Sequence, residues 1–161
     1  MDLSSAHHDV LVLVGTQTGN SELVADAVTD HLAVLGFTSH VVDMADAYPE
    51  MLAEYAQLIA VLCTWAEGTF PDNAKDFALA LDRLDLPLAG LSFGVVGLGD
   101  HDYDPYFLTA ADDLDRMLTA RGAREAAPRL EIDGIPNARH YEETRAWTAG
   151  LAAAFAAQET D

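Results

Sequence analysis

The stretch VLVLVGTQTGNSELVADAV, residues 10–28, changes from one structural period to another. Its first five residues form an apolar and mostly β-branched run, which is typical of a buried strand. After the polar residues that follow, apolar positions recur at helical spacing, from Val24 through Val28 to Leu32 and Leu35. A buried strand that leads into an amphipathic helix predicts a βαβ unit, and hence a parallel sheet.

The same alternation continues to the end of the chain. Four further apolar runs predict strands, at Thr38–Val42, Leu58–Cys63, Phe93–Leu98 and Arg129–Ile132. Three further helical stripes predict helices: Phe77, Leu81 and Leu84; Phe107, Ala111, Leu114 and Leu118; Trp147, Leu151 and Phe155. Gly36 and Gly122 are expected after helix C-termini, and Asp72 is expected to be an N-cap.

This order of elements predicts an α/β three-layer sandwich, with a five-stranded parallel sheet of order 2-1-3-4-5 and helices on both faces. The length of 161 residues suits one domain, which we place at residues 10–157. Residues 1–9 are expected to be a flexible N-terminal segment. Ligands are expected outside the carboxyl ends of the strands, at the switch point between strands 1 and 3.

The composition is strongly acidic, with 27 Asp and Glu against 8 Lys and Arg and a formal charge of -19. Such a surface repels nucleic acid, and no apolar run predicts a membrane span or a secretory signal. The single cysteine, Cys63, suits a reducing cytoplasm. Asp outnumbers Glu two to one and Lys75 is the only lysine, which favours halophilic adaptation over a docking face for a basic partner.

The loop after the first strand carries hydroxyl and amide groups but no positive charge. Thr16, Thr18 and Ser21 can donate to phosphate oxygens at a helix N-terminus, and Gly19 permits close approach of the backbone. An unliganded N-cap at Asn20 or Ser21 is the alternative, but it accounts for one hydroxyl only. Because neither a P-loop lysine nor a dinucleotide-type glycine pattern is present, we expect a terminal monophosphate held by neutral donors.

The segment Cys63–Asn73 follows the third strand and contains Trp65, whose indole offers a stacking surface for a planar ring. Ordinary loop packing of this tryptophan is the alternative. Glu67 could be solvated or could accept a hydrogen bond from a ring N–H. Nothing next to Cys63 would activate it as a nucleophile, so we interpret it as a strand residue.

The segment Gly97–Phe107 follows the fourth strand, and its Tyr103 could complete an aromatic sandwich with Trp65. Asp100, Asp102 and Asp104 have the spacing with which a calcium loop begins. Pro105 stands where such a loop needs glycine, and no glutamate follows at the required distance, so no metal site is predicted.

Taken together, these segments resemble the flavodoxin family, and in particular short-chain members and the FMN domains of diflavin reductases. Thr16-Gln17-Thr18-Gly19-Asn20-Ser21 is similar to the family's FMN-phosphate loop. Thr64-Trp65-Ala66-Glu67-Gly68, followed by Pro71-Asp72-Asn73-Ala74, is similar to the first flavin-ring loop. Leu98-Gly99-Asp100 through Tyr103 and Phe107 is similar to the second. The resemblance implies a non-covalent FMN bound by Thr16, Gln17, Thr18, Gly19, Asn20, Ser21, Cys63, Thr64, Trp65, Ala66, Glu67, Gly68, Leu98, Gly99, Asp100, Tyr103 and Phe107.

One position departs from the family pattern. Ala66 stands where the family usually has glycine, in a peptide that commonly flips when the flavin is reduced. Alanine adopts the flipped conformation less readily than glycine, so we expect weaker stabilisation of the one-electron-reduced flavin. Asp100, Asp102 and Asp104, if they lie near the ring, are expected to lower the potential at which an anionic reduced flavin forms.

The resemblance implies an electron carrier that works between a reductase and an acceptor protein, as a cytoplasmic monomer without catalytic residues of its own. An FMN-dependent NAD(P)H reductase of a quinone or a metal is the alternative. A phosphoacceptor receiver shares the topology, but it needs paired acids after strand 1 and an Asp after strand 3. This chain has Gly15-Thr16 and Cys63-Thr64 at those positions.

Overall fold

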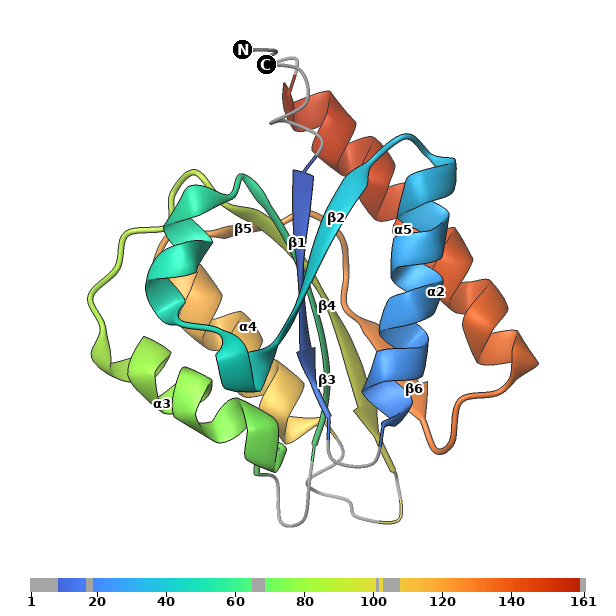
Figure 1. The fold of residues 1–161 in the computed structure, drawn as a ribbon, viewed down its shortest axis with the longest axis horizontal. Coiled ribbons are helices and arrows are strands. Elements are labelled where there is room, and N and C mark those ends of the chain that lie inside the picture. The colour runs from blue at the N-terminus through green and yellow to red at the C-terminus, as the bar shows by residue number, and fades with distance from the viewer. Residues whose placement is uncertain (1–8, 17–18, 65–68, 101, 103–107, 160–161) are drawn as a thin grey trace.

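The computed structural model describes residues 9–16, 19–64, 69–100, 102 and 108–159. Its strands run parallel in the order β2-β1-β3-β4-β5, and β6 also pairs with β4. The strands are β1 Asp9–Gly15, β2 Thr38–Asp43, β3 Gln57–Cys63, β4 Ser92–Gly99, β5 Arg124–Glu125 and β6 Leu130–Asp133. The predicted class and strand order are confirmed (Figure 1).

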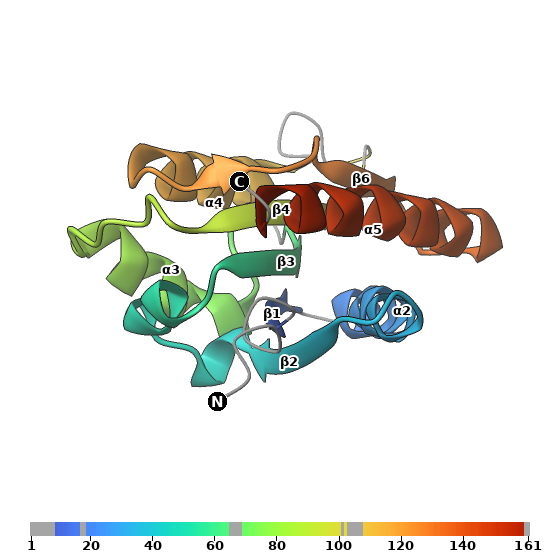
Figure 2. The ribbon, with the colours of Figure 1, turned by 90° about the horizontal axis from the view of Figure 1, so that it is seen from above.

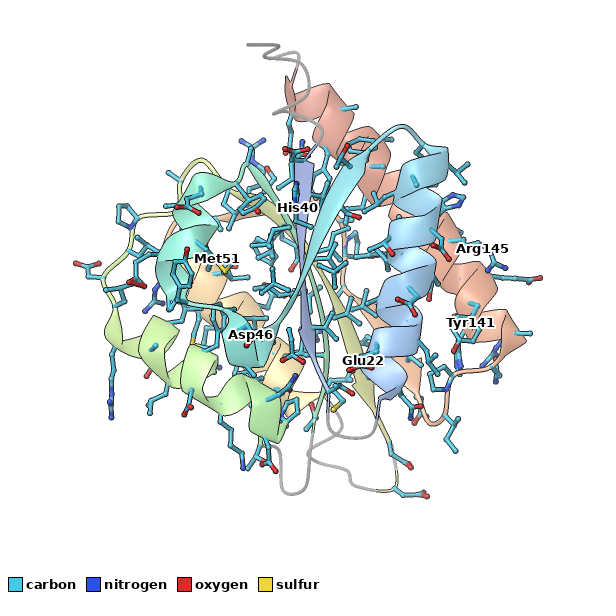
Figure 3. The ribbon with its side chains drawn as sticks, viewed as in Figure 1. Glu22, His40, Asp46, Met51, Tyr141 and Arg145 are labelled. Atoms are coloured by element: carbon cyan, nitrogen blue, oxygen red, sulfur yellow. The ribbon has the colours of Figure 1, made fainter. Side chains whose placement is uncertain are left out.

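Helices cover both faces of this sheet, which makes three layers (Figure 2). The α-helices are α2 Asn20–Val34, α3 Lys75–Arg83, α4 Thr109–Ala120 and α5 Ala138–Glu159. The short 3-10 helices, all between α2 and α3, are η1 Met44–Asp46, η2 Pro49–Glu54 and η4 Asp72–Ala74. On one face α2 and α5 pack together, with Tyr141 and Arg145 of α5 beside α2 (Figure 3). Among the described residues, no helix combines the length and the apolar character that crossing a membrane requires.

The sheet separates two apolar cores, because successive side chains of a strand point to opposite faces. Leu11 and Leu13 of β1 pack towards α3 and α4, where Phe77 and Phe93 are almost fully buried. Val10, Val12 and Val14 pack towards α2 and α5, around Phe155. β1, β3 and most of β4 are therefore buried on both faces, as the apolar runs in the sequence indicate.

Close packing at two glycines brings other elements onto the sheet. A Cβ on Gly94 of β4 would lie 2.6 Å from Leu151 and 2.9 Å from Trp147, so glycine lets α5 rest directly on this strand. A Cβ on Gly15 would lie 2.8 Å from Met44 Sδ and 3.3 Å from the Cβ of Ala74. The end of β1 is thus in close contact with η1 and η4.

Three details of the sequence prediction were wrong. The predicted fifth strand corresponds to β6, and the sheet has a further strand, β5, whose two residues are both exposed. Leu35 follows α2 and is 40% exposed, and Leu84 lies just beyond α3, so neither extends a buried stripe. Asp72 lies within η4 and pairs with Lys75 at 2.9 Å, whereas Ala74 occupies the N-cap of α3.

Other local predictions agree with the structure. Gly36 and Gly122 follow the C-caps of α2 and α4 with φ angles of 88° and 94°, as expected for glycines that end helices. β1 begins at Asp9, while residues 1–8 of the predicted flexible segment lie outside the described residues. Phe107, the first member of one predicted stripe, also lies outside them, and Ala111, Leu114 and Leu118 are buried in α4.

Candidate functional site

The carboxyl ends of β1, β3 and β4 lie at one edge of the sheet, the lower edge in Figure 1. Gly15 at the end of β1 pairs with Leu62, and Cys63 at the end of β3 pairs with Leu98. The chain runs from β1 to β2 on one side and continues with β3 on the other, so the switch point lies between β1 and β3, and ligands of open α/β sheets bind outside such a point. The three loops singled out in the sequence therefore all start from the expected ligand-binding edge.

The loop from β1 to α2 needs glycine for its backbone conformation. Gly19 is the N-cap of α2 with a φ of 91°, and a Cβ added there would meet no heavy atom within 4 Å. Its N–H donates to Thr16 Oγ1 at 2.8 Å, which closes the loop on itself. No side chain of a described residue caps this helix start, where the first N–H groups and the positive end of the helix dipole lie.

Ser21 gives the most direct indication of a ligand at this helix start. Its side chain is fully buried, and its Oγ has no hydrogen-bond partner among the described residues. A buried hydroxyl without a partner is unfavourable by about 1–3 kcal/mol, so a bound ligand, ion or water is expected to complete it. In the first turn of a helix it is a suitable donor for an anion, and the neutral donor set fits the phosphate of FMN.

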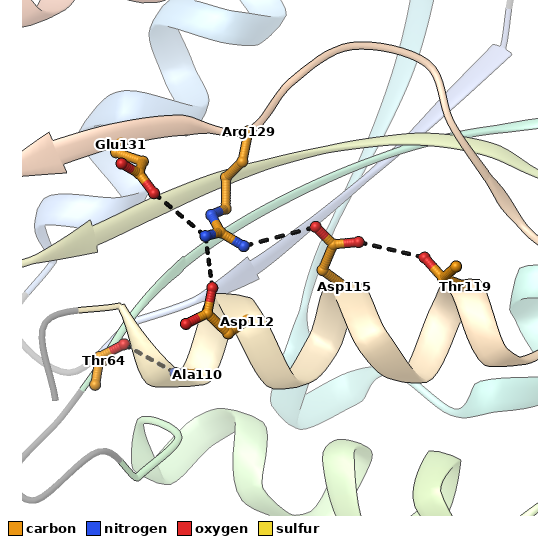
Figure 4. Close-up of polar contacts among 7 residues, drawn as sticks. All are labelled: Thr64, Ala110, Asp112, Asp115, Thr119, Arg129 and Glu131. Atoms are coloured by element: carbon orange, nitrogen blue, oxygen red, sulfur yellow. Dashed lines mark hydrogen bonds and ion pairs between the residues drawn. The ribbon is translucent and has the colours of Figure 1, made fainter. Parts of the chain in front are cut away.

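Thr64 and Cys63 mark the start of the first predicted ring loop. The N–H of Thr64 donates to Leu98 O at 2.9 Å, and its Oγ1 accepts from the N–H of Ala110 at 3.0 Å (Figure 4). Because Ala110 is in the first turn of α4, Thr64 caps that helix from another segment. Cys63 ends β3, is half-buried and packs against the core beside α2 and α5.

The second predicted ring loop leaves the sheet at the end of β4. Leu98 is buried, and Gly99 O accepts from the N–H of Gly134 at 2.8 Å, which ties this edge to the end of β6. Asp100 Oδ1 accepts from the N–H of Asp102 at 2.9 Å, an Asx-type turn. The carboxylate of Asp100 therefore shapes its own loop.

The remaining candidate residues lie outside the described part of the chain. These are Gln17, Thr18, Trp65, Ala66, Glu67, Gly68, Tyr103 and Phe107. Asn20 is the half-buried first residue of α2. Of the three acids proposed to tune the flavin, Asp104 also lies outside. No group of three or more His, Cys, Asp or Glu side chains within the described ranges is placed to hold a metal ion.

Sequence reasoning missed two polar clusters. The first surrounds Asn73 of η4, which hydrogen-bonds to the ends of β1 and β2 and to Thr16. The second surrounds Arg129, which joins α4 to β6 (Figure 4). The motif that contains Asn73 was visible in the sequence, but its partners are between 30 and 59 residues away.

The Arg129 cluster is ionic. The guanidinium contacts Asp112 at 2.5 Å, Glu131 at 3.2 Å and Asp115 at 3.6 Å, and its side chain is only 20% exposed. A hydrogen bond with Asp115 raises the pKa of Glu125 to about 7, and desolvation and the negative charge of Asp115 act in the same direction. Arg129 opposes this rise. Asp112 and Asp115 thus belong to an ion-pair cluster.

An open parallel sheet of this order, with a helix that starts at its switch point without a side-chain cap from the described residues, is typical of a flavodoxin-like α/β domain. The Flavodoxin family model matches residues 12–147, so the chain belongs to the flavodoxin family. Proteins of this family bind FMN, and this chain is an FMN-binding domain of the electron-transfer class.

Solved structures and curated proteins agree with this assignment. A flavodoxin from Streptococcus pneumoniae TIGR4 superposes with a TM-score of 0.82 at 31% identity, covering 90% of this chain and 98% of that one. A short-chain flavodoxin associated with a bacterial microcompartment superposes with a TM-score of 0.82 at 29% identity, covering 90% and 97%.

Among curated proteins, the chain is 34% identical over 145 residues to the sulfite reductase [NADPH] flavoprotein alpha-component of Bacillus subtilis. It is 33% identical over 123 residues to the component of the same name from Aliivibrio fischeri. These alignments cover 89% and 76% of the chain but only 23% and 20% of the relatives. The chain therefore spans about a fifth of the length of these curated relatives.

Proposed function

We propose that this chain carries electrons from a reductase to an acceptor protein by means of non-covalently bound FMN. FMN supplies the one- and two-electron chemistry when bound, and the chain binds it, orients it and sets its electrostatic surroundings. The observation that carries the FMN-binding part of the proposal is the buried Ser21 hydroxyl at the start of α2, which has no hydrogen-bond partner among the described residues.

We assign the phosphate to the loop of residues 16–21. Gly19 provides the left-handed turn that directs the start of α2 towards the ligand, and Thr16 is held in place by its contact with Gly19. The absence of a lysine or arginine from this loop favours a phosphate monoester over a nucleoside triphosphate.

We assign the flavin ring to the loops after β3 and β4, on the basis of the family motif. Trp65 and Tyr103 are the proposed stacking residues. Their supporting partners are Cys63, Thr64, Ala66, Glu67, Gly68, Leu98, Gly99, Asp100 and Phe107. Two described contacts support this assignment: Thr64 fixes the start of α4, and Gly99 fixes the end of β4. The segments from which the two loops start are therefore fixed by hydrogen bonds.

We propose an NADPH-oxidising flavoprotein as the class of electron donor. The curated relatives named above are NADPH sulfite reductase flavoproteins, and this chain matches only a fifth of their length. The oxidation of NADPH would then take place outside the region that matches this chain, and its electrons would pass to the FMN bound here. The acceptor is proposed to be a separate protein.

We also propose that most of the acidic surplus is an adaptation to high salt, and that the chain works as a cytoplasmic monomer. Exposed acids such as Asp26 and Asp30 on α2 have no role in the core. Because salt shortens the Debye length to about 3 Å at 1 M, it screens repulsion between such charges. The melting temperature is therefore expected to rise with potassium chloride, and a sizing measurement is expected to give one chain.

The test of the proposed function is an anaerobic electron-transfer assay with the FMN-loaded protein. NADPH alone is expected to leave the flavin oxidised. Addition of catalytic amounts of an NADPH-oxidising flavoprotein reductase is expected to bleach it, and cytochrome c is then expected to be reduced at a rate set by the concentration of this chain. Rapid bleaching by NADPH alone would favour an NADPH reductase, and failure to retain FMN would overturn both functions.

A further inference from the structure

Asn73 makes three side-chain hydrogen bonds that leave its amide only one orientation. Its Oδ1 accepts from the N–H of Thr16 at 2.8 Å, while its Nδ2 donates to Asp43 Oδ1 at 2.8 Å and to Val14 O at 3.3 Å. Both N–H groups and the oxygen of the amide are therefore used. A flipped amide would set its oxygen against two acceptors and its N–H groups against the donor Thr16 N–H.

Asp43 holds this amide from the other side. It is the N-cap of η1, where its Oδ1 also accepts from the N–H of Ala45 at 2.8 Å. Because it accepts two hydrogen bonds, the carboxylate of Asp43 is held in one orientation. Hydrogen bonds to a charged group are also stronger than those between neutral groups. The end of β2 therefore fixes the orientation of Asn73.

The bond from Thr16 to Asn73 continues into the phosphate loop. The N–H of Thr16 donates to Asn73, while its own Oγ1 accepts from the N–H of Gly19, the N-cap of α2. Ser21, with its buried hydroxyl, lies two residues further on. A continuous path of hydrogen bonds thus runs from Asp43 through Asn73 and Thr16 to the start of α2.

Backbone packing brings Asn73 within reach of this loop. Ala74, the next residue, is fully buried against the end of β1, where a Cβ on Gly15 would come within 3.3 Å of it. The 3-10 helix η4 is therefore pressed against β1 just before the phosphate loop. Since η4 follows the first ring loop in the sequence, Asn73 also ties the end of that loop to the phosphate loop.

From these contacts we propose that Asn73 is a positioning residue for FMN phosphate, which acts through Thr16 and is oriented by Asp43. The proposal rests on the assignment of the phosphate to residues 16–21. Asn73 itself need not touch the cofactor. Its effect is expected in the part of the binding affinity that the phosphate supplies, and not in the part supplied by the flavin ring.

The test compares FMN with riboflavin, which has the ring but no phosphate, by fluorescence titration of the apoprotein. Wild type is expected to bind FMN much more tightly than riboflavin. In Asn73→Ala the ratio of the two affinities is expected to fall roughly three- to tenfold, the equivalent of about one hydrogen bond, while riboflavin affinity changes little. An equal loss for both ligands, or an unchanged ratio, would overturn the proposal.

Asn137→Ala is the matched control. Asn137 Oδ1 accepts from the N–H of His140 at 3.1 Å at the start of α5, so this asparagine also fixes a helix start, and it lies outside the three loops that we assign to FMN. It is expected to reduce thermal stability and to leave the FMN-to-riboflavin ratio unchanged. A similar change of ratio in this control would show that general destabilisation is the cause, and would overturn the proposal.

Two further results keep the test decisive. If Asn73→Ala does not fold, Asp43→Ala removes only the orienting carboxylate and is expected to lower the ratio roughly threefold. An unchanged ratio in folded Asp43→Ala would then contradict the proposal.

If wild type itself does not prefer FMN to riboflavin, the phosphate assignment fails, and the role of Asn73 fails with it. That result differs from failure of Asn73 alone, in which wild type keeps its preference.

Discussion

The Asn73 cluster and the Arg129 cluster both join elements far apart in the sequence, but with different chemistry. Asn73 uses a neutral amide and one carboxylate to join η4, the end of β1 and the end of β2. In the Arg129 cluster, one guanidinium contacts three carboxylates and so joins β6 to α4. Neutral hydrogen bonds are directional and depend little on salt, whereas ion pairs respond to salt and pH.

This difference between a neutral and an ionic cluster indicates how a chain with a charge of -19 can bind an anion. The loop assigned to phosphate has no cation and is positioned by amide and hydroxyl groups, so binding depends on geometry and on the dipole of α2. Arg129, one of only 8 basic residues, stabilises the fold instead. We therefore expect changes in the first cluster to alter ligand binding, and changes in the second to alter stability.

Arg129→Met is expected to have the largest effect. Methionine keeps much of the apolar stem but leaves Asp112, Asp115 and Glu131 without their shared cation. The free energy of unfolding is expected to fall by about 2 kcal/mol, between the values for exposed and for buried ion pairs. Urea denaturation measures this, and the FMN-to-riboflavin ratio is expected to stay unchanged.

Arg139→Ala is the control for that change. Arg139 pairs with Glu143 at 3.7 Å on the exposed surface of α5, and its loss is expected to alter stability by less than about 0.5 kcal/mol. Equal effects of the two substitutions would show that the Arg129 cluster is no more than an ordinary surface pair.

Gly19→Ala is expected to affect both stability and binding. Gly19 and Gly36 lie at opposite ends of α2 with φ angles of 91° and 88°, and a Cβ at either position would meet nothing within 4 Å. Alanine at each is therefore expected to lower the free energy of unfolding by about 1 kcal/mol. Only Gly19→Ala is expected to weaken FMN binding in a fluorescence titration. Equal FMN affinities of the two variants would count against the phosphate assignment.

Glu125→Gln is expected to have the smallest effect, visible as a change in pH dependence. The pKa of Glu125 is about 7 in the folded chain, against an ordinary value of 4.5. Between these pH values the folded state binds more protons than the unfolded state, so this group makes stability fall as pH rises from about 4.5 to about 7. Urea denaturation across this window should show a shallower fall in Glu125→Gln. The same slope in both proteins would refute the raised pKa.

Most of the fold was predictable because strands that are buried on both faces of a parallel sheet appear in the sequence as apolar runs. β1, β3 and β4 are of this kind, and their order follows from the alternation with helices. β5 was missed because Arg124 and Glu125 are both exposed and polar, so no local pattern distinguishes them from a loop. Leu84 was misplaced because its spacing continues the stripe, although α3 ends one residue earlier.

The candidate site was predictable only in part. Gly19 at a positive φ and Ser21 buried at a helix start agree with an interpretation made from residue types alone. The polar clusters could not be found in this way. Asn73 and Thr16 are far apart in the sequence, and their hydrogen bond forms only when the segments between them, which include β2 and β3, have folded. Thr64 was assigned to cofactor binding, and its contact with Ala110 adds a structural role that no motif indicated.

The measurement that tests the central claim most directly is FMN binding by Ser21→Ala apoprotein. FMN affinity is expected to fall roughly tenfold and riboflavin affinity to stay the same. The stability of the apoprotein is expected to stay level or rise, because the substitution removes a buried hydroxyl that has no partner among the residues the structure describes. Thr29→Ala, which removes a hydroxyl from the same helix, is expected to leave both affinities unchanged. Unchanged FMN affinity in Ser21→Ala would contradict the assignment of the phosphate to the start of α2.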